Sequence, residues 1–324
     1  MQKRDFEHLM TQLERLTPAQ RVQLSDVLVG LDRRLAVAAV IEGEDTTSPN
    51  CPQCGAAETG QPWGYASGLR RFRCAACRKT FNRLTGTTLA GLRKKEQWID
   101  YGAALKDRLS VRKAAESCGV HYTTTFRWRH RFLAVPADVK PASLQGIVEA
   151  DETFFLESFK GRRHGLERSP RKRGGKAAKR GLSREQIPVL VVRDRAGATT
   201  DAVLRGLSVK HIGRVLGPIV PADAVLCSDG ARAYRTFAKK AGIRHEAVRA
   251  APRQRTRGAF HIQSVNAYHS RLKEWMKPFH GVATAYLPNY LGWRRMIERY
   301  GAALDAKACL KEAVGQRGPT TNAN

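Results

Sequence analysis

The chain has 324 residues, of which 42% are hydrophobic, so it can form two or three domains with real cores, and global disorder is excluded. Its 57 Lys and Arg residues against 29 Asp and Glu give a net charge of +28, which indicates a polyanionic partner or, alternatively, a ribosomal-type protein. The odd count of seven cysteines and the absence of a signal peptide favour a reducing, cytoplasmic compartment over a disulfide framework. No apolar run is long enough to span a membrane.

Residues 1–45 have the pattern of two helices. Apolar residues such as Phe6, Met10 and Leu13 follow the helical period. The run Thr17-Pro18-Ala19-Gln20 then supplies an N-cap, a proline at the first helical position and a capping-box glutamine. We expect a helical hairpin that serves for packing or for a dimer contact.

Two cysteine pairs follow in residues 48–84. The four residues are Cys51, Cys54, Cys74 and Cys77, spaced as C-x2-C-x19-C-x2-C. This spacing predicts a zinc ribbon with one structural Zn²⁺ held by four thiolates. A thioredoxin-like redox role is the alternative, which the second pair disfavours. Several arginines of the same segment suggest contacts with DNA phosphates, although exposed basic residues are common.

Residues 94–134 have the pattern of a helix-turn-helix module. Ser110 can cap one helix, Cys118-Gly119-Val120 can form the turn, and Thr123 or Thr124 can cap the next helix, which we expect over residues 125–132. We expect Phe126 and Trp128 in the core. The candidate DNA contacts on its exposed side are Arg127, Arg129, His130 and Arg131. A packed three-helix connector is the alternative.

Residues 145–300 alternate strands and helices. We expect strands at 146–155, 188–194, 199–206, 224–228 and 243–248, and helices at 209–217, 231–241, 260–277 and 284–300. This order predicts a ribonuclease-H-like α/β fold with a mixed five-stranded sheet, preceded by the zinc ribbon and the helical DNA-binding module. In that fold the first and fourth strands are neighbours.

Four polar residues of this domain form the candidate catalytic site. Asp151 lies in the first strand and Asp229 ends the fourth, so the fold brings them together, and Asn266 lies on a later helix two turns before Lys273. Hard oxygen ligands suit Mg²⁺ or Mn²⁺, and two such ions can assist displacement at a phosphodiester. Glu149 shares the face of Asp151 and is a possible supporting residue. The alternative is that both aspartates only end strands and that Asn266 is a surface amide.

Three segments are expected to lack regular structure. Residues 160–184 carry many basic residues among glycines, including Arg171, Lys172 and Arg173. We expect a flexible loop there that grips DNA, or else a merely solvated linker. Residues 136–143 contain two prolines and should form a linker, and residues 301–324 should form a disordered tail.

Several motifs together resemble a known family. They are the cysteine ribbon, Val148-Glu149-Ala150-Asp151-Glu152-Thr153, Ser228-Asp229-Gly230, the run from His261 through Asn266 to Lys273, and Gly281-Val282-Ala283-Thr284. Over residues 48–300 the chain resembles bacterial insertion-sequence transposases of the DDE superfamily, in the group that joins a zinc ribbon to a ribonuclease-H-like domain. The resemblance implies metal binding by Asp151, Asp229 and Asn266 and a role on DNA for Lys273.

The resemblance also implies partners and a reaction. The partners would be double-stranded DNA, as terminal inverted repeats and as target, and further copies of this chain in a synaptic complex at the bacterial nucleoid. The reaction would be metal-dependent cleavage and strand transfer at the ends of an insertion sequence. The alternatives are a catalytically inactive DNA-binding regulator derived from a transposase and a structure-specific nuclease.

Overall fold

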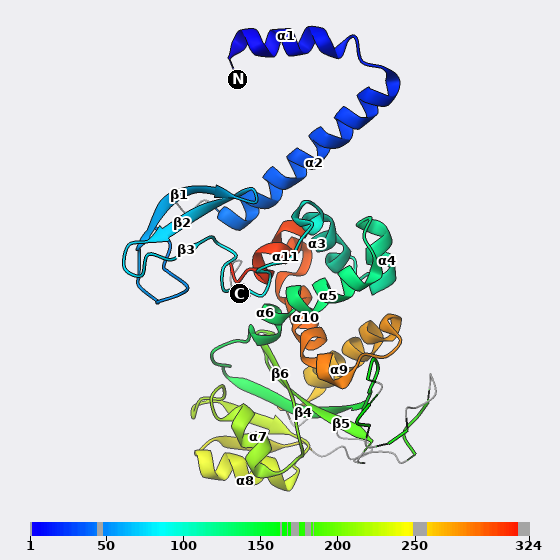
Figure 1. Ribbon diagram of the computed structural model, residues 1–324. Coiled ribbons are helices and arrows are strands. Elements are labelled where there is room, and N and C mark those ends of the chain that lie inside the picture. Colours follow the sequence, from blue (N-terminus) through cyan, green and yellow to red (C-terminus); the bar gives the residue numbers. More distant parts are fainter. Residues whose placement is uncertain are drawn as a thin grey trace. The chain divides into compact units, whose positions relative to one another are not determined.

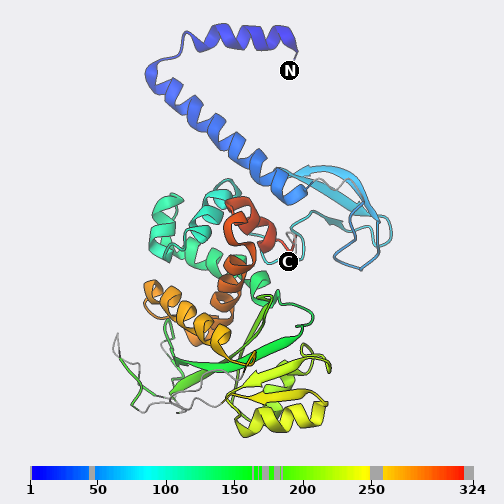
Figure 2. The same cartoon turned by 180° about the vertical axis from the view of Figure 1, so that it is seen from behind.

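The computed structural model describes residues 2–43, 48–162, 164–166, 168–169, 175–178, 183, 185–248 and 258–316. The chain forms two compact units (Figures 1 and 2). The first unit combines Met1–Phe132 with Asp305–Gly318, and the second contains Leu133–Leu304. No helix among the described residues has the length and apolar character required to cross a bilayer.

The first unit begins with helices α1 (Lys3–Leu13) and α2 (Pro18–Glu42). The expected capping box of α2 is present, because the Gln20 N–H donates to the Thr17 hydroxyl at 3.3 Å and the Thr17 N–H donates to the Gln20 side chain at 2.9 Å. The packing expected of a hairpin is not seen. Phe6 and Leu28 are 50% and 52% exposed, so the apolar stripes of the two helices are not buried against each other.

The cysteine-rich segment forms a small antiparallel sheet. Its strands are β1 (Gly60–Ala66), β2 (Leu69–Cys74) and β3 (Thr80–Phe81), in that order. Phe72 and Phe81 stack with ring centroids 5.7 Å apart, and with three of the cysteines they form the core of this sheet. So few apolar residues give little core, and a bound metal would compensate for that.

The rest of the first unit is helical. It contains η1 (Lys95–Gln97), α3 (Trp98–Lys106), α4 (Val111–Ser117), α5 (Tyr122–Phe132) and α11 (Ala306–Ala313). Trp98, Tyr101, Trp128 and Phe132 pack edge to face in its core. Ser110 caps α4 as expected, but α5 begins at Tyr122, so Thr123 and Thr124 lie inside its first turn.

The prediction of a disordered tail over 301–324 was wrong for residues 306–313. These residues form α11, which packs on α3 and buries Cys309 and Leu310. Asp305 caps the helix by accepting from the Ala308 N–H at 2.6 Å. Gly102 allows the close approach, since a Cβ there would collide with the Ala306 carbonyl. The apolar residues of this segment are mostly alanines, which give only a weak periodic signal for such tertiary packing.

The second unit is built on the predicted mixed sheet. Its strands are β4 (Ile147–Leu156), β5 (Gln186–Asp194), β6 (Thr199–Val203), β7 (Val225–Ser228) and β8 (Arg244–Ala247), in the spatial order β6-β5-β4-β7-β8. β4, β5 and β6 pair antiparallel, whereas β7 pairs parallel with both β4 and β8. The expected neighbourhood of the first and fourth strands is therefore confirmed, and the fold is ribonuclease-H-like.

Helices cover both faces of this sheet (Figure 1). They are α6 (Ala134–Asp138), α7 (Val209–Leu216), α8 (Arg232–Ala241), α9 (Gln263–Met276) and α10 (Leu287–Tyr300), with short helices η2 (Lys277–Phe279), η3 (Thr284–Tyr286) and η4 (Gly301–Ala303). Val148 and Ala150 of β4 pack with Ile212 of α7 and Tyr234 of α8 in the main core. The side chains between them on β4, including Glu149, point to the opposite face, which α9 covers.

A buried ion pair fixes α6 and α10 to the sheet. Arg295 of α10 pairs with Asp201 of β6, and both are under 5% exposed. The same guanidinium donates to the Ala137 carbonyl at 2.8 Å, so it also holds the C-terminal end of α6. The first residues of the expected linker at 136–143 therefore belong to helix α6, which ends at Asp138. Arg295 donates hydrogen bonds to carbonyl groups of this helix.

We expect Asp201→Ala to lower the free energy of unfolding of this unit by about 3–5 kcal/mol, because it leaves the Arg295 charge buried without its carboxylate. Urea unfolding would measure the change. Asp223→Ala is the matched control, since Asp223 is exposed and should change stability by less than about 0.5 kcal/mol. Equal stability of the two variants would contradict the role given to the pair.

Candidate active site and zinc centre

The four ribbon cysteines converge as the spacing predicts. Their Sγ atoms all lie within 4.8 Å of one another, and no other group of three or more His, Cys, Asp or Glu ligand atoms within the described ranges does so. The Cys51–Cys77 and Cys54–Cys74 sulfurs are each 3.7 Å apart. The Cys77 N–H, with the Thr59 hydroxyl, lowers the pKa of the Cys74 thiol to about 6, which favours the metal-binding thiolate. The site therefore fits Zn²⁺ as a closed, structural ion.

The two predicted aspartates lie at the same end of neighbouring strands. The parallel pairs of β4 with β7 run from Ile147–Val225 to Glu149–Cys227, Asp151 follows two residues later on β4, and Asp229 comes directly after the last residue of β7. β7 ends there because Asp229 accepts from the Ala231 N–H at 2.9 Å in a tight turn. Gly230 suits this turn, since its φ is +80° and a Cβ would lie 2.9 Å from the Ala247 side chain.

Carboxyl groups repel one another at this end of the sheet. Burial, together with the charge of Asp229, raises the pKa of Asp151 to about 6, whereas Lys273 opposes the rise. Burial and the charges of Asp151 and Asp229 raise the pKa of Glu152 to about 7, against a 2.6 Å hydrogen bond that Tyr234 donates to it. Half-buried carboxylates that repel each other are suited to hold a divalent cation through hard oxygen ligands.

Helix α9 carries the remaining predicted residues, and among them Lys273 acts on Asp151. The His269 ring lies 3.8 Å from the Asp151 carboxylate, and burial, with the charge of Lys273, lowers the pKa of His269 to about 4, so the ring is neutral. Lys273 is exposed and acts electrostatically on Asp151. Asn266 is exposed one turn before His269, and among the described residues no hydrogen bond joins its side chain to either aspartate.

Glu149 fixes the start of α9. This buried carboxylate accepts from the Val265 N–H at 3.0 Å, which satisfies a free donor in the first helical turn. Arg195, in the turn after β5, pairs with the same carboxylate at 2.5 Å and donates to the Ala259 carbonyl at 2.9 Å. The ring of His261 lies 3.2 Å from Glu149. The strand that carries Asp151 thus holds the helix that carries Asn266 and Lys273.

The Gly281–Thr284 motif contacts the end of β4. The Thr284 N–H donates to the Ser158 carbonyl at 2.9 Å, and the Ser158 N–H donates to the Thr284 hydroxyl at 2.8 Å. Nearby, the Glu157 N–H donates to the Glu185 carbonyl at 2.9 Å, which closes the base of the 160–184 segment. The sequence marked this motif without giving its role, because both partners are remote in the chain.

The structure revises the DNA-binding residues expected on α5. Arg127 is exposed, but placing Arg129 on the exposed side was wrong, since it is fully buried and donates to the Leu109 carbonyl at 2.7 Å. Half-buried Arg131 donates to the Ala90 carbonyl, and burial lowers the pKa of His130 to about 4. Phe126, expected in the core, is 45% exposed. Phe126 and Arg129 thus occupy the opposite environments from those expected, whereas Trp128 is buried as expected.

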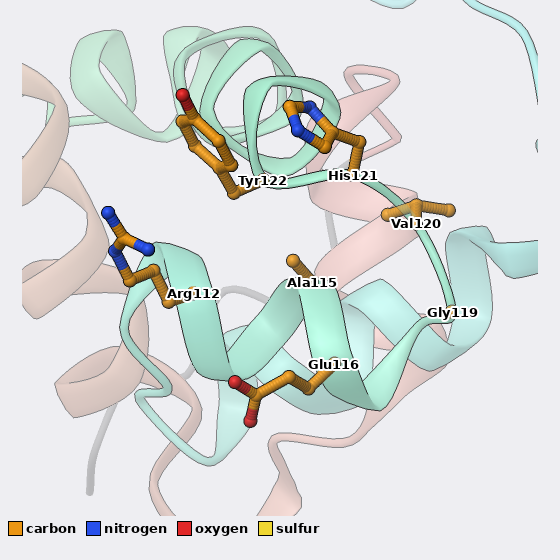
Figure 3. A pocket seen from close by; sticks show the side chains of 7 residues that line it. All are labelled: Arg112, Ala115, Glu116, Gly119, Val120, His121 and Tyr122. Carbon is orange, nitrogen blue, oxygen red and sulfur yellow. The ribbon is translucent and has the colours of Figure 1, made fainter.

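A shallow pocket of ≈ 380 Å³ opens between α4 and the start of α5 (Figure 3). Arg112 and Tyr122 lie at one end of it and Gly119 and Val120 at the other. The Arg112 guanidinium lies 5.3 Å from the centre of the Tyr122 ring. Arg171, Lys172 and Arg173, the remaining predicted DNA contacts, fall outside the described residues.

Known proteins similar to this chain are found in mobile elements. Residues 143–294 match the ISXO2-like transposase domain. A Halobacterium salinarum protein, described as an uncharacterized protein in transposable element ISH50, is 26% identical over 245 residues, which are 74% of this chain and 82% of that protein. These matches confirm the resemblance to insertion-sequence transposases of the DDE superfamily.

Solved structures give weaker matches. A chain of a simian T-cell lymphotropic virus intasome in complex with PP2A regulatory subunit B56 gamma is 9% identical with a TM-score of 0.31, covering 68% of this chain and 76% of that chain. A pre-cleavage Mos1 transpososome chain is 11% identical with a TM-score of 0.23, covering 67% and 75%. These low sequence identities and TM-scores do not assign residues to the site.

We expect Cys74→Ser to lose the ribbon zinc, because three thiolates leave the tetrahedral site open. Metal analysis of the purified protein should fall from about one zinc per chain to well below one. Cys118→Ser is the control, since Cys118 is a buried turn residue outside the cluster and should leave the zinc content unchanged. A variant with full zinc would refute the four-cysteine site.

We expect Glu149→Gln to loosen the start of α9, because it removes the charge that pairs with Arg195. The cost should be about 3 kcal/mol, low for a broken buried pair, since Arg195 keeps some access to water. Hydrogen exchange at the Val265 and Asn266 amides should accelerate. Glu274→Gln is the control, an exposed change on the same helix that should leave these exchange rates unaltered. Unaltered rates in Glu149→Gln would show that the Glu149 carboxylate does not anchor the helix.

Proposed function

We propose that this protein is a transposase that cleaves DNA at the ends of an insertion sequence and joins the released strand to target DNA. The observation that carries the proposal is that Asp151 lies on β4 and Asp229 directly follows β7, the parallel neighbour of β4, within residues that match a transposase domain. The mutual repulsion of the carboxyl groups supports a cation site there. Asp151, Asp229 and Asn266 would hold Mg²⁺ or Mn²⁺.

The bound ions would supply Lewis-acid activation of the attacking hydroxyl and the leaving oxygen. The chain's own residues position the substrate around them. Lys273, exposed beside Asp151, can bind a phosphate of the scissile strand. The His269 ring, 3.8 Å from the Asp151 carboxylate, would pack against it. Glu149 bonds the first turn of α9. It thereby fixes the position of this helix, which carries Asn266 and Lys273, relative to β4.

The first unit would select the DNA. We propose that α4 and α5 act as a helix-turn-helix module with Arg127 toward duplex DNA, and that the ribbon adds phosphate contacts. Arg129 takes no part, because it is buried. Pairing of two element ends would require at least two copies of the chain in one complex. The net charge of +28 supports a nucleoid-associated location on DNA.

We expect Asp151→Ala and Asp229→Ala each to lower cleavage of element ends by roughly 10²–10³-fold or more, because each removes a charge that would hold the metal. Binding to the uncut ends should stay unchanged. The measurement is cleavage and joining of labelled end DNA with Mg²⁺ or Mn²⁺, with exposed Asp223→Ala as the control.

The outcomes separate the rival functions. Cleavage retained by Asp151→Ala would reject the site. Cleavage without joined products in the unmutated protein would indicate a structure-specific nuclease. End binding with no cleavage under either metal would indicate an inactive DNA-binding regulator.

A further inference from the structure

The β1 strand of the ribbon exposes two aromatic side chains. Trp63 is 48% exposed and Tyr65 is 77% exposed. The other tryptophans of the chain are all at most 7% exposed, namely Trp98, Trp128, Trp275 and Trp293. Exposed rings this large on so small a sheet contribute nothing to its core. They therefore call for a partner.

The backbone is shaped to present these rings. The β1–β2 pairing shifts between Pro62 and Tyr65, so β1 has a bulge there, and Gly64 adopts a φ of +76° within it. A bulge turns side chains away from their regular direction and is common at binding sites. β1 is also an edge strand, and Pro62 removes one N–H from its free side. Addition of a protein strand to this edge is therefore disfavoured.

Arginines of β2 lie beside the rings. The Arg73 guanidinium lies 4.7 Å from the centre of the Trp63 ring and donates to the Arg78 carbonyl at 3.3 Å, so its position is fixed. Arg71 donates to the Thr80 hydroxyl at 3.1 Å. Residues 48–84 contain six Lys and Arg residues and one acidic residue, Glu58. The charge beside the aromatic rings thus favours a polyanion over an ordinary protein surface.

The combination of rings and fixed cations matches one kind of nucleic acid. Aromatic side chains stack on the flat faces of bases, which are accessible only where bases are unpaired, and arginines neutralise the adjoining phosphates. A paired duplex hides its base faces and would leave Trp63 without a function. Strands that separate at a cleaved or splayed DNA end would expose such bases.

We propose that the aromatic hairpin face, defined as Trp63 of β1 with Arg71 and Arg73 of β2, binds unpaired bases of a DNA strand by stacking on the indole ring. Tyr65 lies beyond the bulge, opposite Arg70, and is not part of this face. The proposal rests on the proposed function only in taking DNA as the partner. It gives the ribbon a preference for single-stranded or splayed DNA, separate from duplex recognition by α4 and α5.

The test uses the full chain with Asp151→Ala, so that cleavage cannot occur. The probes are a thymidine single strand of about 20 nucleotides and a duplex of equal length, a span well above a single-strand site. Trp63 is the only strongly exposed tryptophan, so quenching of intrinsic fluorescence by the single strand reports directly on this face. We expect quenching by the single strand and little quenching by the duplex.

Variants assign the affinity to the Trp63 ring. Trp63→Ala should weaken single-strand binding about tenfold, the effect of losing one stacked base, and change duplex binding less than twofold. Tyr65→Ala, beyond the bulge, should change single-strand binding less than twofold. Trp63→Phe should keep most of the affinity. Phe126→Ala is the matched control, an exposed aromatic on α5, and should spare single-strand binding. Zinc content should remain constant throughout, which shows that the ribbon stays folded.

Specific results would overturn the proposal. Equal weakening of single-strand and duplex binding by Trp63→Ala would indicate a general phosphate surface, and no weakening of either would indicate a partner other than DNA. If Trp63→Ala loses zinc, Trp63→Leu decides the question, because it keeps an apolar side chain but cannot stack on a base. Binding is measured without cleavage. Stacking of unpaired bases on the ribbon can therefore be rejected while transposase activity is retained, and it can be confirmed in a protein that lacks transposase activity.

Discussion

The parallel pairing of β4 with β7 is the contact on which the candidate active site depends. Because the two strands are parallel neighbours, two aspartates that are distant in the chain lie at the same end of the sheet, and the charge of Asp229 acts on Asp151. The main core on the other face, with Val148 and Leu226, fixes this register, since a slip by one residue would turn buried side chains toward α9. Apolar packing on one face of the sheet thus places charges on the other.

The face that carries the carboxylates is organised by charge instead. Glu149 is buried between Arg195 and the first turn of α9, so one carboxylate ties together the β5–β6 turn, the central strand and the helix. A buried ion pair adds little net stability but discriminates strongly between arrangements. Geometry at the site is therefore determined by an anchor two residues away from Asp151, which need not itself touch DNA or metal.

Much of this architecture was predictable from the sequence, because strand and helix order and cysteine spacing are local signals. The five strands and the cysteine cluster followed from such patterns. Three features did not. Arg129 was placed outside because a single charge is normally solvated, whereas its carbonyl partner at Leu109 comes from another helix. The packing of α11 and the bond between Thr284 and Ser158 also join remote segments, which periodicity cannot reveal.

The closed base of the 160–184 segment has a consequence for how such proteins diversify. Glu157 and Glu185 meet through the backbone, and Thr284 fastens the adjoining Ser158, so the chain leaves and re-enters the sheet at a fixed point. The entropy of closing a loop grows slowly, by about 0.6 kcal/mol per doubling of its length. Residues can thus be gained or lost between these anchors at little thermodynamic cost, while the paired strands and their aspartates stay in register.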